Sequence, residues 1–171
     1  MLRRQLGASG VEISQIGLGA WAIGGWMWGG QEESASIAAI HAAVDHGVNW
    51  IDTAPIYGSG HSEIMVGRAL KEMPASKRPM VFTKFGLGDN SSQRRQSAAR
   101  HEVLAECDAS LKRLGVERID LFQLHWPAPQ PIAETAGACE TLLTSGKIRA
   151  VGVSNFSVAQ LEEWQATGVP L

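Results

Sequence analysis

The chain is 171 residues long and carries 15 basic against 17 acidic side chains, which gives a formal net charge of −2. With 44% hydrophobic and 19% charged residues, its composition is that of a globular protein rather than a disordered or fibrous one. The near-neutral charge argues against nucleic-acid and membrane-surface partners, and no apolar stretch approaches the roughly 20 residues of a membrane helix. Two cysteines, Cys107 and Cys139, are too few for a disulfide scaffold, so we expect a cytoplasmic protein.

Short β-rich runs alternate with helical runs along almost the whole chain. The chain begins with Arg3–Leu6 and Val11–Ile13, which flank a glycine-containing turn and predict a small β-hairpin. Five further strands are predicted, with starts about 30 residues apart, the length of one βαβ unit. They are Ile16–Ala20, Val48–Asp52, Met80–Phe85, Ile119–His125 and Ile148–Val153. Regular alternation of this kind predicts an α/β fold with a parallel sheet.

The segments between the strands carry apolar residues at helical spacing, and both cysteines fall on such stripes. The last helix is predicted over Val158–Thr167, because Ser157 and Gln160 form a capping box at its start. Residues 169–171 resemble the beginning of a sixth strand. No linker or low-complexity segment divides the chain, so we expect a single domain over residues 1–171.

Ionisable side chains follow the predicted strands at their carboxyl ends. Parity places Asp52 and Lys84 on the same face of successive strands, and Gln123 and His125 share that face of the next one. Tyr57, the only tyrosine, lies five residues after Asp52 in a loop rich in proline and glycine. Alone, Tyr57 is compatible with a loop anchor and His125 with a core histidine. The ionisable residues together favour a ligand site, because ligands bind at this edge of α/β sheets and barrels.

Six ordered motifs resemble those of the aldo-keto reductase family, and the match runs over the whole length of the chain. They are IGLGAW (16–21), IDTAPIYG (51–58), TK (83–84), SLKRLG (110–115), IDLFQLHWP (119–127) and GKIRAVGVSNFS (146–157). The resemblance implies a TIM-type (β/α) barrel that reduces aldehydes or ketones with NADPH.

The resemblance also implies a catalytic group of four residues, Asp52, Tyr57, Lys84 and His125. In that arrangement Tyr57 gives its proton to the carbonyl oxygen as hydride reaches the carbon. Lys84, held by Asp52, favours the phenolate form, and His125 orients the carbonyl by a hydrogen bond.

Coenzyme and substrate contacts follow from the same resemblance. The residues expected to contact NADP(H) are Gly19, Ala20, Trp21, Asp52, Ser154 and Asn155, with the last two holding the nicotinamide carboxamide. The residues expected to contact the small carbonyl substrate are Trp26, Trp28, Tyr57, His125 and Trp126, and the tryptophans favour an apolar or aromatic compound. No spacing of histidines and cysteines matches a metal site, so we expect none.

The pattern departs from the family in its strand count, because a complete barrel has eight strands and needs about 250 residues. The chain is therefore expected to be an incomplete barrel, either a portion of a longer reductase or a short product. A short product would leave open sheet edges, which favour self-association. Two other functions stay open: a coenzyme-binding regulatory subunit, as in the related potassium-channel β subunits, and an inactive half barrel.

Overall fold

The computed structural model describes residues 1–7, 9–25, 28, 32–87 and 96–171, and within them the chain has the predicted α/β fold. Five parallel strands form one sheet in the order β3-β4-β5-β6-β7. They are β3 (Leu18–Gly19), β4 (Trp50–Asp52), β5 (Met80–Phe85), β6 (Leu121–Leu124) and β7 (Val151–Val153). The helices are α1 (Glu33–Asp45), α2 (His61–Glu72), α3 (Arg100–Leu114), α4 (Ile132–Thr144) and α5 (Val158–Ala166). Short 3-10 helices are η1 (Ala22–Gly24) and η2 (Ala75–Lys77).

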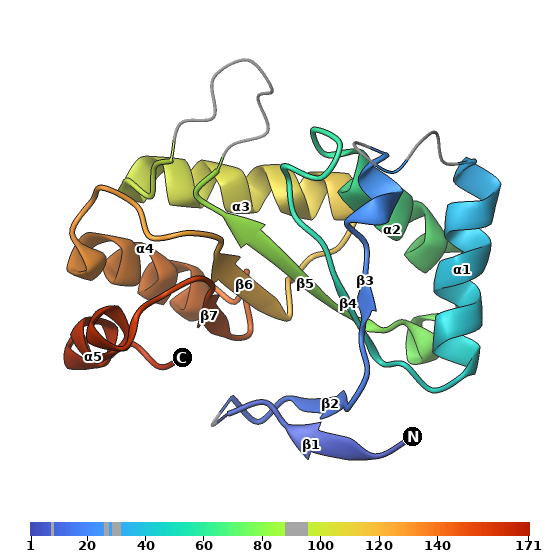
Figure 1. Ribbon diagram of the computed structural model, residues 1–171, viewed down its shortest axis with the longest axis horizontal. Coiled ribbons are helices and arrows are strands. Elements are labelled where there is room, and N and C mark those ends of the chain that lie inside the picture. Colours follow the sequence, from blue (N-terminus) through green and yellow to red (C-terminus); the bar gives the residue numbers. More distant parts are fainter. Residues whose placement is uncertain (8, 26–27, 29–31, 88–95) are drawn as a thin grey trace.

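The helices form an arc around the outside of the sheet, running from α1 through α2 and α3 to α4 and α5 (Figure 1). Apolar side chains between the two layers make the main core, including Ile51, Met65 and Trp164. Phe85 and Phe122 stack there with ring centroids 4.6 Å apart. No helix in the described part of the chain is long and apolar enough to cross a membrane.

The N-terminal hairpin pairs β1 (Arg3–Gln5) with β2 (Glu12–Ser14) in antiparallel register, as predicted, and lies across the amino ends of the strands (Figure 1). The indole N–H of Trp50 donates to the Ser14 carbonyl at 2.9 Å, and the Trp50 ring stacks on Phe82. A second, smaller apolar cluster on the inner face of the sheet comprises Val11, Phe82, Leu121 and Ala150. The hairpin thus covers this end of the inner face, opposite the carboxyl edge.

Four of the five sheet strands are shorter than the sequence predicted. The edge strand β3 pairs only with β4, over two residues, and the predicted first residue, Ile16, is 63% exposed. Ile119 and Ile148 form only an isolated bridge ahead of β6 and β7. Between that bridge and β6, the Asp120 carboxylate accepts the Val81 N–H at 2.9 Å, where a regular ladder would use a carbonyl.

The last helix begins as predicted, with both hydrogen bonds of the Ser157–Gln160 capping box present. It ends at Ala166 rather than Thr167, because Thr167 is the residue that caps the helix. The Thr167 hydroxyl donates to the Trp164 carbonyl at 2.7 Å and so closes the final turn.

Candidate active site

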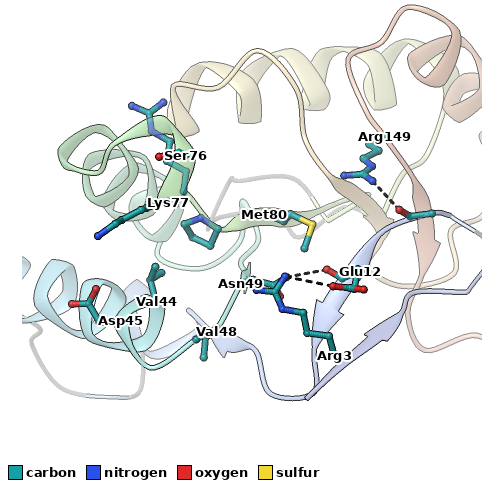
Figure 2. Close-up of a pocket in the computed structure, with 14 residues that line it drawn as sticks. Arg3, Glu12, Val44, Asp45, Val48, Asn49, Ser76, Lys77, Met80 and Arg149 are labelled. Atoms are coloured by element: carbon teal, nitrogen blue, oxygen red, sulfur yellow. Dashed lines mark hydrogen bonds and ion pairs between the residues drawn. The ribbon is translucent and has the colours of Figure 1, made fainter. Parts of the chain in front are cut away.

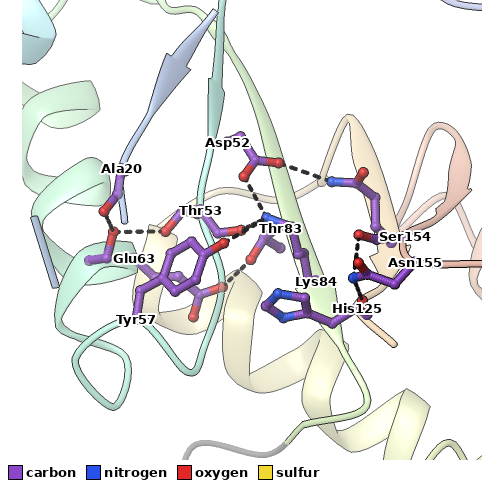
Figure 3. Close-up of polar contacts among 12 residues, drawn as sticks. Ala20, Asp52, Thr53, Tyr57, Glu63, Thr83, Lys84, His125, Ser154 and Asn155 are labelled. Carbon is purple, nitrogen blue, oxygen red and sulfur yellow. Dashed lines mark hydrogen bonds and ion pairs between the residues drawn. The ribbon is translucent and has the colours of Figure 1, made fainter. Parts of the chain in front are cut away.

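Three neighbouring strands end in polar side chains at one edge of the sheet. Asp52 is the last residue of β4, Lys84 is the penultimate residue of β5, and His125 directly follows β6. Because parallel strands bring their carboxyl ends to the same edge, these side chains lie together. Tyr57 reaches the same place from the loop between β4 and α2 (Figure 3). The structure therefore gathers the four residues that the sequence predicted to form one group.

Lys84 is the centre of this group. Its side chain is only 8% exposed, and its ammonium nitrogen lies 2.5 Å from Asp52 Oδ1, 2.9 Å from the Thr53 carbonyl and 3.4 Å from the Tyr57 hydroxyl (Figure 3). An ammonium has three N–H donors, so each donor has an acceptor here. Burial of a cation is costly unless the cation is paired, and these three contacts meet that requirement.

The second oxygen of Asp52 accepts a hydrogen bond from Gln123 Nε2 at 3.1 Å. Gln123 stands on β6, and Gly152 of the neighbouring strand β7 leaves room for it: a Cβ at Gly152 would lie 3.0 Å from Gln123 Cγ. The sequence placed Gln123 on the correct face but predicted no role for it. The contact depends on the pairing of Gln123 with Gly152, which strand periodicity alone does not specify.

The loop that carries Tyr57 packs backbone against backbone on η1. Gly58 has a φ of 65°, and a Cβ on it would overlap the Gly24 carbonyl oxygen. At the base of the loop, the hydroxyls of Thr53 and Ser62 lie 2.9 Å apart, and Ser62 donates to the Ala20 carbonyl at 2.8 Å. These contacts tie the ends of the loop to the carboxyl end of β3 and fix the position of the tyrosine.

His125 faces Tyr57 edge to face, with the ring centroids 5.9 Å apart. The pKa of the His125 imidazole is lowered from 6.5 to about 4. Burial is the main cause; the nearby Lys84 ammonium also lowers the pKa, and the Asp52 carboxylate raises it by less. The ring is therefore neutral near pH 7, so it has one N–H donor and one acceptor nitrogen. A neutral imidazole at this place is suited to donate a hydrogen bond without transferring a full charge.

Ser154 and Asn155 follow β7 at the same edge. Asn155 has a φ of 62°, a left-handed conformation that is uncommon outside glycine. Its side-chain nitrogen donates to the His125 carbonyl at 2.8 Å and to the Ser154 hydroxyl at 3.0 Å. Within the described part of the chain, no hydrogen bond engages the side-chain oxygen of Asn155. The strained residue thus links the end of β7 to the histidine.

The predicted coenzyme contacts at the end of β3 differ in exposure. Gly19 is exposed, whereas Ala20 is fully buried and its carbonyl accepts from Ser62. Trp21 is 46% exposed and lies beside the tyrosine, with ring centroids 6.4 Å apart.

Two further aromatic residues predicted to contact substrate, Trp28 and Trp126, have exposed side chains. Trp28 packs edge to face on Trp21, and Trp126 is 45% exposed next to His125. Trp26, also predicted for this role, lies outside the described residues.

One hollow lies away from this group, at the amino ends of the strands beneath the hairpin (Figure 2). Its volume is about 660 Å³, and its walls carry both signs of charge, from Arg3, Glu12, Asp45, Lys77 and Arg149. None of the four catalytic candidates lines it. Among the residues that the structure describes, no cluster of three or more His, Cys, Asp or Glu side chains could hold a metal ion.

The chain is similar to known proteins of one family. The model of the aldo/keto reductase family matches residues 15–171. Aldo-keto reductase YhdN of Bacillus subtilis is 49% identical over 159 residues, covering 92% of this chain and 48% of that protein. The NADH-specific methylglyoxal reductase of Escherichia coli is 37% identical, over 98% of this chain and 56% of that enzyme.

Solved structures give the same result. The glycerol dehydrogenase AKR11B4 from Gluconobacter oxydans superposes with a TM-score of 0.87 at 44% identity, covering 96% of this chain and 52% of that one. An aldo-keto reductase from Klebsiella pneumoniae in complex with NADPH superposes with a TM-score of 0.80 at 30% identity, over 96% of this chain and 54% of that one. The chain thus spans about half the length of the relatives it matches, and its sheet corresponds to an incomplete barrel.

Proposed function

The chain belongs to the aldo/keto reductase family, and from this we propose that it reduces aldehydes or ketones to alcohols with NADPH. The observation that carries the proposal is the threefold contact of the Lys84 ammonium with Asp52, Thr53 and Tyr57. A phenol hydrogen-bonded to a buried ammonium is suited to proton transfer, because the cation stabilises the negative charge left on the oxygen.

In this proposal Tyr57 is the general acid. The O–H bond of Tyr57 breaks, and the proton passes to the carbonyl oxygen of the substrate. That oxygen becomes the hydroxyl of the alcohol. The electron pair stays on the Tyr57 oxygen, 3.4 Å from the Lys84 ammonium. Asp52 keeps the ammonium in place, and Gln123 keeps the carboxylate in place. His125 donates its single N–H to the carbonyl oxygen and orients it.

Ser154 and Asn155 fit the carboxamide of a nicotinamide ring. They stand at the same edge as Tyr57, and the side-chain oxygen of Asn155 is left to accept from an amide while the Ser154 hydroxyl can donate or accept. A reduced nicotinamide coenzyme, when bound, supplies the hydride. The exposed Gly19 and Trp21 and the carboxylate of Asp52 extend the proposed contact surface along the ends of β3 and β4.

The choice between NADPH and NADH is a finer part of the proposal. One structural relative is described in complex with NADPH, whereas one sequence relative is described as NADH-specific. We favour NADPH, in agreement with the sequence resemblance. For the substrate we favour a small apolar or aromatic carbonyl compound, because the exposed Trp21 lies beside Tyr57 and carries the exposed Trp28 against it, and the exposed Trp126 directly follows His125 in the chain.

Titration of the 171-residue chain with NADPH and, separately, NADH tests the proposal through quenching of tryptophan fluorescence. We expect saturable quenching by NADPH at lower concentration than by NADH, together with coenzyme oxidation that depends on an added aromatic aldehyde. Stoichiometric binding without turnover on any carbonyl compound would instead support the regulatory coenzyme-binding role. Absence of binding would contradict the proposal for this chain.

A further inference from the structure

A buried ion pair lies behind the catalytic edge, on the opposite face of β5 from Lys84. Glu63, in the first turn of α2, has a side chain with 0% exposure. One carboxylate oxygen accepts from the Thr83 hydroxyl at 2.7 Å, and the other lies 2.5 Å from Arg113 Nε. Arg113 belongs to the last turn of α3 and also donates to Ser110. The carboxylate therefore joins α2, β5 and α3 at one point.

The arginine of this ion pair contacts the loop that carries Tyr57. Gly60 ends that loop with a φ of 89°, and a Cβ on it would lie 2.7 Å from Arg113 Cδ. The arginine stem thus packs directly against the loop backbone three residues after the tyrosine. Because the arginine stem occupies the space that a side chain at Gly60 would need, Arg113 cannot move toward the loop without a shift of Gly60.

The other end of the network reaches the residues that hold the ammonium. Thr83 precedes Lys84 on β5, so the hydroxyl bonded to Glu63 and the ammonium project from opposite faces of one strand. Ser62 precedes Glu63 and binds Thr53, whose carbonyl accepts from Lys84 (Figure 3). Glu63 and Arg113 therefore contact the supports of both partners in the Lys84–Tyr57 hydrogen bond.

We propose that Glu63 and Arg113 are a positioning pair that sets the place of the Tyr57 ring relative to Lys84. Neither residue contacts the proposed reacting atoms. They act through Gly60 on one side and through Thr83 on the other. The consequence for turnover rests on the proposed function, whereas the placement of the ring does not.

Because Tyr57 is the only tyrosine, its ring can be observed alone. A chain labelled with ¹³C-tyrosine gives one set of ring signals by NMR, and these report the neighbouring rings of Trp21 and His125. The test variant is the double substitution Glu63→Gln/Arg113→Met. It removes both charges together, so no buried charge is left unpaired, and the introduced amide oxygen can still accept from Thr83. The matched control is Glu33→Gln. Glu33 begins α1, and the change breaks its exposed ion pair with Arg68 of α2, the helix that also carries Glu63.

We expect the double variant to fold, with the indole N–H signal of the buried Trp164 unchanged, and the Tyr57 ring signals to move by more than their line width. The control should leave both signals in place. Tyr57 signals that coincide with those of the parent protein would overturn the proposal. Failure of the double variant to fold would also overturn it, because the pair would then serve folding rather than positioning.

Turnover gives a second reading that separates this proposal from the proposed function. If the parent chain reduces a carbonyl compound, the double variant should lower kcat on the order of 10²-fold with little change in KM, since a displacement of about 1 Å has such an effect. If the Tyr57 ring signals move but kcat is unchanged, the link between ring position and catalysis is overturned. If the parent chain has no turnover, the proposed function fails, and the NMR result still decides the positioning role.

Discussion

Lys84 Nζ lies 3.4 Å from the hydroxyl oxygen of Tyr57, although the two residues are 27 positions apart in the chain. The contact arises because β4 and β5 are parallel neighbours and the loop after β4 folds back over their carboxyl ends. The ammonium also lies over the phenol ring, 5.1 Å from its centroid. A cation so placed stabilises negative charge on the phenol oxygen and gives the tyrosine its proposed role.

The ion pair of Lys84 with Asp52 should matter for folding as well as chemistry. Lys84→Met leaves a carboxylate with reduced compensation, and we expect the free energy of unfolding in urea to fall by about 2 kcal/mol. This is less than the roughly 3–5 kcal/mol of fully buried pairs, because Asp52 is 28% exposed. Asp52→Asn should lower the free energy of unfolding less in the Lys84→Met variant than in the parent protein, since the two side chains interact. If the losses of the two single variants simply add in the double variant, the two residues are not coupled. Lys147→Met, at an exposed ion pair with Asp108, is the control and should change little.

Stability should depend on pH through His125. Its pKa is about 4 in the folded protein against 6.5 as the ordinary value, so the unfolded chain binds the proton more readily. The stabilisation is fully present above pH 6.5 and is lost as the pH falls towards 4. Urea unfolding at several pH values should show that, as the pH falls from 6.5 towards 4, the free energy of unfolding decreases less for His125→Gln than for the parent protein. His101→Gln, at an exposed position, should keep the parent slope. Parallel curves for His125→Gln and the parent would refute the assignment.

Much of this site could be predicted from the sequence, because strand parity and parallel order place Asp52, Lys84 and His125 at one edge whatever the details of the loops. The partners of these residues could not. Gln123 reaches Asp52 through a register and a neighbouring glycine that periodicity does not specify. Glu63 and Arg113 meet across 50 residues, and charged residues on amphipathic helices are ordinarily exposed. Four of the five predicted sheet strands were too long, mainly at their amino ends, because each prediction began at an apolar residue two or three positions before the first residue of the observed strand.

Gly152 should be intolerant of a side chain. In Gly152→Ala the added Cβ would lie 3.0 Å from Gln123 Cγ, so we expect a loss of about 1–3 kcal/mol in unfolding free energy. Carbonyl turnover should fall with it, because Gln123 would leave Asp52. The matched control is Gly137→Ala within α4, where an added Cβ meets nothing within 4 Å. That change should stabilise the chain by about 0.5–1 kcal/mol. If both alanines stabilise, the Gly152 contact is not a constraint.

The open edges of the sheet lead us to propose self-association. Within the described sheet, β3 and β7 each have a strand neighbour on one side only. Unpaired strand edges favour pairing with another chain. Sedimentation velocity across a wide concentration range should show a rising average sedimentation coefficient. A single monomeric species at all concentrations would contradict this proposal, without bearing on the catalytic residues.

The role of Tyr57 as general acid is tested most directly by Tyr57→Phe, which removes one oxygen and keeps the ring against Trp21 and His125. We expect carbonyl-dependent NADPH oxidation to fall by about 10² to 10⁴-fold, the usual contribution of general acid catalysis. NADPH binding, followed by tryptophan fluorescence, should be unchanged. A parent chain that turns over and a Phe variant with the same rate would contradict the account.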